Sequence, residues 1–179
     1  TLGMLFRQAT HLHRPFHIDV FNNEGEPVLT IKRKYQFFIS KVVVIHNGVV
    51  IGVSKEKFIP VLRKYDLFVA KEGTEVPENG RHSDSNYISF GKIRSGPITY
   101  TFPVKDGNDS VIASIDRNWI GLAREMFTDG GVYVVRMDAV EAQIGEIYSD
   151  GFREQQLNWK QRAVLLACAI SIDFDQFSR

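Results

Sequence analysis

The sequence predicts a mostly β domain in which an antiparallel barrel closes around one C-terminal helix. Short alternating segments, separated by turn residues, recur at even spacing through most of the 179 residues, which is typical of all-β folds. One apolar segment, Ala163–Ile172, follows near the end and contains no charge and a single polar residue. Many short strands followed by one apolar helix indicate a barrel that is closed around the helix. Closure also removes the exposed edges of the sheet.

The predicted helix covers residues 159–177. A helix that is apolar on every side belongs in a core or a membrane. The uncharged run between Arg162 and Asp173 has ten residues, whereas a span needs about 20. Burial in the core is therefore favoured, with a membrane span or an interfacial segment as alternatives. Lys160 and Arg162 at its start and Asp173 and Asp175 at its end oppose the helix dipole, so we expect tertiary partners to set these positions.

Composition indicates one globular domain without a strong overall field. The chain is 44% hydrophobic and 24% charged, with a net charge of +1. Any basic surface must then be local, and nucleic acid is not an expected partner. The one cysteine, Cys168, lies within the apolar helix. It excludes a disulfide framework, indicates an intracellular site and is expected to be a small buried hydrophobe.

Two hairpins are predicted in the first third of the chain. Residues 17–21 and 28–33 alternate on either side of a polar turn. Residues 41–53 contain two β-branched runs joined by Asn47-Gly48, the strongest short hairpin signal.

The middle of the chain predicts further strands. Residues 58–70 indicate two short strands, the first limited to an edge or an end by Pro60. Residues 71–86 form a polar surface loop, and residues 87–104 hold another pair of strands. After a turn, residues 111–117 form one more strand.

The last part before the helix contains a strand and an insertion. Residues 132–137, VYVVRM, are mostly apolar and include three valines, which predicts a strand. Residues 139–158 are acidic and polar, and we interpret them as an insertion before the helix. Asp129 and Asp138 flank the strand and are weak candidates for calcium, because too few oxygen ligands lie between them and Arg136 is unfavourable for a cation.

A basic segment followed by aromatic residues is the main candidate for a binding site. Its members are Lys32, Arg33, Lys34, Phe37 and Phe38. Three interpretations stay open: a solvated strand end with core aromatics, a contact with anionic lipid head groups, and a nucleic-acid contact. The lipid contact would gain about 1 kcal/mol per cation near a charged bilayer.

Several classes of active site have no support in the sequence. It contains no phosphate-binding glycine loop, no zinc-type Cys/His spacing and no nucleophile elbow. We therefore expect no bond-making chemistry, no firm cofactor and no enzyme activity.

One segment resembles the signature of the phospholipid scramblase family. It consists of Trp119, Gly121, Arg124, Glu125, Phe127, Thr128 and Asp129 at the family's spacing. Residues 14–16, 28–33 and 167–174 also resemble the family, so the resemblance extends over residues 14–177. It divides the chain into an N-terminal segment, 1–13, and a domain, 14–179.

The resemblance implies a tubby-like fold, which is a closed β-barrel around a hydrophobic C-terminal helix. That fold has further strands before residues 14–16, so part of the barrel is expected to be missing or to lie outside this sequence, which begins at Thr1. The implied activity is calcium-stimulated, energy-independent movement of phospholipids between leaflets. The fungal mitochondrial branch is the most similar, which implies a mitochondrial, membrane-associated protein.

Two differences from the family affect its regulation. Mammalian members carry palmitoylated cysteines at the position of residues 34–39, where this chain has none. The family's calcium loop begins at the position of Asp129. Where the family has its next acidic residues, this chain has Gly130 and Gly131. Two functions follow from the resemblance. The first is movement of phospholipids between leaflets, with binding of anionic lipid. The second is a non-catalytic tubby-like module that binds lipid or protein, as a homo-oligomer or as a subunit of a larger mitochondrial assembly.

Overall fold

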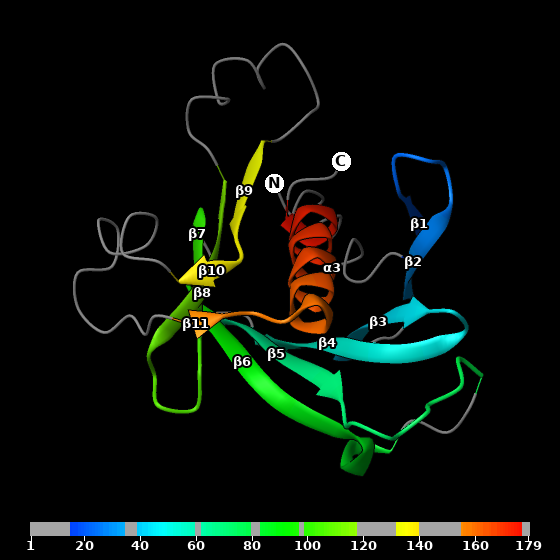
Figure 1. Ribbon diagram of the computed structural model, residues 1–179. Helices are drawn as coiled ribbons and strands as arrows, with labels where there is room; N and C mark the ends of the chain where they lie inside the picture. Colours follow the sequence, from blue (N-terminus) through cyan, green and yellow to red (C-terminus); the bar gives the residue numbers. More distant parts are fainter. Residues whose placement is uncertain are drawn as a thin grey trace, which may run out of the picture.

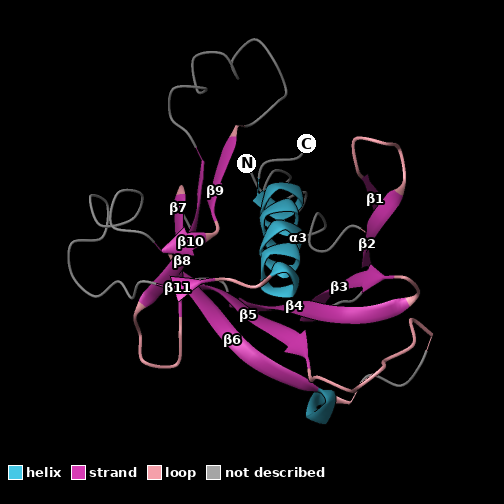
Figure 2. Cartoon of the chain, in the orientation of Figure 1, coloured by secondary structure: helices cyan, strands magenta, loops and turns pink. Residues whose placement is uncertain are grey.

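The computed structural model describes residues 15–34, 39–59, 62–79, 83–96, 99–117, 132–139 and 155–176. They form an antiparallel sheet and a C-terminal helix, α3 (Trp159–Gln176) (Figures 1 and 2). The strands of this sheet are β1 (Phe16–Phe21), β2 (Pro27–Arg33), β3 (Ile39–His46), β4 (Val49–Ile59), β5 (Leu62–Ala70), β6 (Tyr87–Ser95), β7 (Thr101–Lys105), β8 (Val111–Arg117) and β9 (Tyr133–Arg136).

The sheet has nine strands, and each pairs with its neighbours in the sequence. It curves around α3, which lies in the concavity with β9 on one side and β1 and β2 on the other (Figure 1). Within the described part of the chain the sheet is not closed, because its order runs from β1 to β9 without a pairing between these two. The mostly β prediction is therefore confirmed, and the closed barrel is not.

The predicted hairpins are present. Asn47 and Gly48 connect β3 to β4 with φ values of 50° and 75°, the left-handed backbone that a two-residue turn of this type requires. The two short strands predicted within residues 58–70 are not both present: residues 58 and 59 are the end of the long strand β4, and one strand, β5, covers Leu62–Ala70. The end of β4 at Ile59, just before Pro60, agrees with the limit expected from this proline. The predicted loop 71–86 contains a short 3-10 helix, η1 (Asp84–Asn86).

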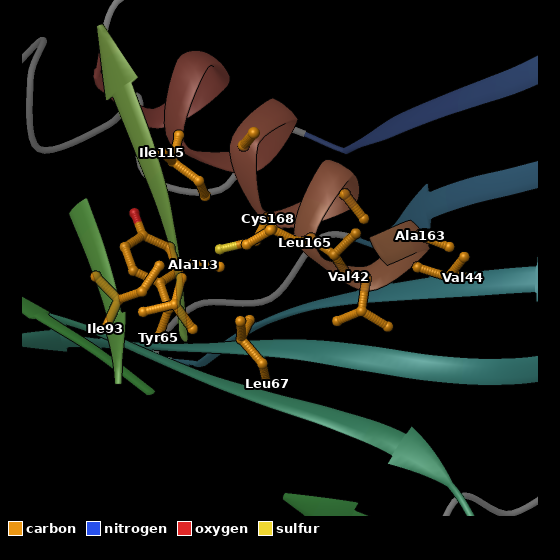
Figure 3. Packing of buried hydrophobic residues seen from close by; sticks show 14 of the residues in the cluster. Val42, Val44, Tyr65, Leu67, Ile93, Ala113, Ile115, Ala163, Leu165 and Cys168 are labelled. Carbon is orange, nitrogen blue, oxygen red and sulfur yellow. The ribbon is translucent and has the colours of Figure 1, made fainter. Parts of the chain in front are cut away.

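The main core lies between the concave face of the sheet and α3 (Figure 3). Val164, Leu165 and Cys168 of the helix are fully buried there. Gly52 of β4 allows the helix to approach, since a Cβ at this position would lie 2.2 Å from Cγ2 of Val164. The helix predicted from the apolar run is therefore a core helix. None of the described helices is both long enough and apolar enough to span a bilayer.

A second, smaller core lies on the outer face, where Val76 of the loop after β5 covers Val50 and Val53. The amide of Val50 donates to the carbonyl of Val76 at 2.8 Å, which holds this loop against the sheet. One end of the outer face is thus covered by loop residues rather than by a helix.

Two short strands stand at the ends of the predicted insertion. β10 (Asp138–Ala139) pairs with β11 (Gln155–Gln156), and residues 140–154 lie outside the described residues. The N-terminal segment 1–13 also lies outside them. The division of the chain into these segments stays a prediction.

The ends of α3 show what holds its charged residues in place. Asn158 and Gln161 form a capping box, each side chain accepting a hydrogen bond from the other's amide at 2.9 Å. Arg162 pairs with Asp138 at 2.7 Å, and Asp175 pairs with Arg33 at 2.7 Å. For these two residues the expectation is confirmed: Asp138 of β10 and Arg33 of β2 offset positions that the helix dipole disfavours.

Candidate functional site

The predicted basic segment is divided between two sides of the sheet. Side chains alternate along β2, so Lys32 and Arg33 point to opposite faces. Lys32 lies on the outer face and pairs with Glu78 at 2.6 Å, while Lys34 is exposed just after the strand. Arg33 is buried against α3. The part of the segment that reaches solvent therefore consists of the half-buried Lys32 and the exposed Lys34, and Phe37 and Phe38 lie outside the described residues.

Arg33 is the centre of a buried polar cluster between the sheet and the last turns of α3. Its Nη1 donates to both carboxylate oxygens of Asp175, at 2.7 and 2.8 Å, and to Oγ of Ser171 at 3.2 Å. The guanidinium carbon lies 4.8 Å from the ring centroid of Phe16, which in turn contacts Phe174 with a centroid separation of 4.8 Å. Arg33 thereby connects β1 and β2 to the helix.

Glu56 of β4 adds a second carboxyl group to this cluster. Burial, and after it the neighbouring charge of Asp175, raise the pKa of Glu56 to about 8. Tyr65 lies directly across from Glu56 on β5 and is fully buried, which raises its pKa well above the usual range. The cluster therefore contains a carboxyl group that holds its proton near neutral pH.

Cys168 lies in the same interior, one helical turn before Ser171. Burial raises the pKa of its thiol to about 12, so the thiolate is suppressed at neutral pH. The prediction that Cys168 is a buried hydrophobe is confirmed.

The other predicted site residues do not form a described site. Asp138 accepts hydrogen bonds from Nη2 of Arg162 on both carboxylate oxygens, at 2.7 and 3.0 Å. Asp129 lies outside the described residues, as do the other members of the motif: Trp119, Gly121, Arg124, Glu125, Phe127 and Thr128. The described ranges contain no group of three or more side chains suited to a metal ion.

Glu56 and Tyr65 are not among the site residues predicted from the sequence. A signal was present: once β4 is aligned as a strand, Gly52, Ser54 and Glu56 share the face that contacts the helix. A glutamate at an inward position of a strand indicates a buried acid.

Comparison with known proteins gives one family. A family model described as Scramblase matches residues 1–179. The altered inheritance rate of mitochondria protein 25 of Saccharomyces cerevisiae is 39% identical over 194 aligned positions, which cover 98% of this chain and 57% of that protein. A phospholipid scramblase family protein of Schizosaccharomyces pombe is 30% identical over 196 positions, which cover 99% of this chain and 48% of that protein. The chain spans about half the length of these curated relatives, and no solved structure matches it.

Proposed function

The chain belongs to the Scramblase family, and from this membership we propose that it binds anionic phospholipids and promotes their energy-independent movement between membrane leaflets. The family match over the whole chain carries the proposal. Such movement breaks no covalent bond, so no catalytic residue is assigned. The physical task is to lower the free energy of moving a polar head group through hydrocarbon.

The proposed lipid contacts begin at the end of β2. Lys34 is exposed and Lys32 is half-buried on the outer face, and each would contribute about 1 kcal/mol near a charged bilayer. Phe37 and Phe38 follow them in sequence and are proposed as the apolar part of the contact. Arg33 is assigned the role of holding α3 on the sheet, because its guanidinium is buried against Asp175.

The proposed location is a mitochondrial membrane. The budding-yeast relative is named for the inheritance of mitochondria and is 39% identical to this chain. We propose that the tubby-like architecture implied by the family places the nine-stranded sheet at the membrane surface. Lipid movement by such a protein requires oligomerisation or local thinning of the bilayer, because one short core helix offers no path of its own.

The test of lipid movement uses the full-length protein reconstituted in phosphatidylcholine and phosphatidylserine vesicles. A fluorescent lipid is placed in both leaflets, and a reductant that does not cross the membrane bleaches the outer one. Bleaching beyond the outer-leaflet fraction, without ATP, is the expected result. Bleaching that stops at the level of protein-free vesicles contradicts lipid movement.

The burial of α3 favours a second candidate, a tubby-like module that binds lipid or protein without moving lipid, as a subunit of a larger mitochondrial assembly. Val164, Leu165 and Ile172 are fully buried by the sheet. Hydrogen exchange over residues 163–172, with and without vesicles, distinguishes the two candidates. Unchanged protection on vesicles that bind the protein supports the module, and loss of protection supports a helix that leaves the sheet to act on the bilayer.

A further inference from the structure

The register of the sheet aligns basic side chains on its outer face. Residues directly opposite one another on paired strands point to the same side, and the pairings run without interruption from β3 to β7. One row across these strands contains Lys41, Lys55, Asp66, Lys92 and Lys105. A second row contains Lys57, Lys64 and Arg94. We call these two rows the basic face.

The basic face points away from the helix. The residues that alternate with it include Leu67, Ile93 and Val104, which are fully buried in the core against α3. Because successive side chains of a strand point to opposite sides, the two rows lie on the convex side of the sheet. Lys57 and Arg94 are exposed there, and the other cations of the face are partly exposed.

Many neighbours within the basic face carry the same charge. The directly opposed pairs of cations are Lys41–Lys55, Lys57–Lys64, Lys64–Arg94 and Lys92–Lys105. Like charges directly opposite each other destabilise a sheet. At Lys41 burial lowers the pKa, and the charge of Lys55 lowers it further. The face therefore contains repulsion that an anionic partner would relieve.

Carboxylates offset only part of this charge. Asp66 pairs with Arg94, Asp84 with Lys55, and Asp109 with Lys92. In the described part of the face, seven basic side chains against these three carboxylates leave four positive charges. The whole chain carries only +1, so positive charge is concentrated on this side of the sheet.

We infer that the basic face is a docking surface for the anionic phospholipid head groups of a bilayer. The choice of lipid rests on the proposed function. Neighbouring strands lie about 4.8 Å apart, so the first row spreads its cations over about 19 Å, enough to meet several head groups. Six of the seven cations are lysines, which act as point charges toward a diffuse negative surface.

Two further features agree with a bilayer as the partner. Lys32 lies on the same face, directly across from Val43, and extends the basic face toward the basic segment. Single-stranded nucleic acid is bound by stacking of its bases on exposed aromatic rings. Phe68 and Tyr87 are the described aromatic residues next to the lysine row; Tyr87 is buried, and the Lys55 ammonium covers Phe68 at 5.0 Å from the ring centroid. Neither ring offers a platform for bases.

The test compares two charge-matched double variants of the full-length protein in co-sedimentation with phosphatidylcholine vesicles, with and without phosphatidylserine. Lys57→Gln with Lys64→Gln removes two cations from the basic face. Each cation near an anionic bilayer contributes about fivefold in affinity, so we expect about 25-fold weaker binding. Lys71→Gln with Lys160→Gln removes two cations from elsewhere and should change binding by less than about threefold.

The thermal midpoint gives an independent check on folding. Removing Lys57 and Lys64 eliminates like-charge pairs, so the midpoint should stay equal or rise. If the wild type binds and both double variants bind equally well, the basic face is not the docking surface, while the proposed function stands. If the wild type does not bind anionic vesicles at all, the proposed function fails first. Binding to single-stranded DNA but not to vesicles would overturn the inference in favour of nucleic acid.

A site-specific probe tests the orientation directly. The native thiol of Cys168 is buried, so a cysteine introduced at an exposed position can be labelled selectively. Ser89 is exposed on the outer face beside Phe68, and Gln156 is exposed in β11, shortly before α3. A polarity-sensitive dye at Ser89→Cys should shift to the blue on anionic vesicles, and the same dye at Gln156→Cys should not. The reverse pattern contradicts docking by the basic face.

Discussion

The guanidinium of Arg33 donates to both carboxylate oxygens of Asp175, at 2.7 and 2.8 Å, although the two residues are 142 positions apart. Their side chains are 0% and 5% exposed, so the pair is a buried connection between β2 and the last turn of α3. The connection explains why an acid is retained at the C-terminal end of the helix, where the dipole disfavours it. It also determines which changes should release the helix from the sheet.

Arg33→Met is expected to lower the free energy of unfolding by about 3 to 5 kcal/mol. The change leaves the Asp175 carboxylate buried without its guanidinium, and removal of one partner from a buried pair is strongly destabilising. Urea unfolding measures the effect. Arg94→Met is the control, because its pair with Asp66 is partly exposed and should contribute about 1 kcal/mol or less. A loss below that level at Arg33 would show that the pair does not hold the helix.

Glu56 should make stability depend on pH. Its folded pKa of about 8 lies above its ordinary value of 4.5, so the folded state binds the proton more tightly than the unfolded state does. The contribution of this proton to the free energy of unfolding is complete below pH 4.5. It is lost as pH rises toward 8, at about 1.4 kcal/mol per pH unit within that window. The difference between wild type and Glu56→Gln in thermal midpoints from pH 5 to 9 isolates this effect. Parallel profiles for the two proteins would contradict it, and Glu26→Gln, at an exposed turn, is the control.

Gly52→Ala is expected to destabilise the protein by about 1 to 3 kcal/mol through overpacking. The added Cβ would lie 2.2 Å from Cγ2 of Val164 and 2.7 Å from the carbonyl oxygen of Phe68. Combination with Val164→Ala should cost less than the sum of the single changes, because the second change makes room for the first. Gly107→Ala, where nothing lies within 4 Å, should stay within about 0.5 kcal/mol. Strict additivity of Gly52 and Val164 in chemical unfolding would argue against direct contact.

Cys168 should be unreactive toward thiol reagents while α3 is on the sheet. It is buried, and its thiol pKa of about 12 leaves little thiolate at pH 8. The rate of modification is measured in buffer, in urea and on anionic vesicles. We expect slow reaction in buffer and fast reaction in urea. Fast reaction on vesicles would indicate that the helix leaves the sheet there, whereas slow reaction favours the binding module.

The local elements of the fold were predictable because they depend on short-range chemistry. Asn47-Gly48 specifies a two-residue turn through its left-handed backbone angles. A proline lacks an amide donor and limits a strand, and β4 ends at Ile59, directly before Pro60 in the sequence. The closed barrel was not predictable in this way. Closure depends on the pairing of the first and last strands, and no local pattern reports a pairing between residues that far apart.

The candidate sites show the same division. Residues 32–34 are visible in the sequence as a basic run, but the alternation of β2 sends Arg33 inward and Lys32 outward. The lysines of the basic face are scattered from residue 41 to residue 105, and only the strand register brings them into rows. Sequence spacing within one strand could show which face each occupies, but not which residue of another strand it meets.

The sequence by itself determined that this is a mostly β chain with one apolar C-terminal helix and a buried cysteine, because alternation, turn residues and an uncharged run act over a few positions. The tertiary structure alone decided that Asp175 meets Arg33, that Glu56 holds its proton near neutral pH, and that seven cations share one face. These relationships depend on register and on the docking of α3. Both follow from the packing of the whole core, in which each long-range contact becomes favourable only when the others are formed.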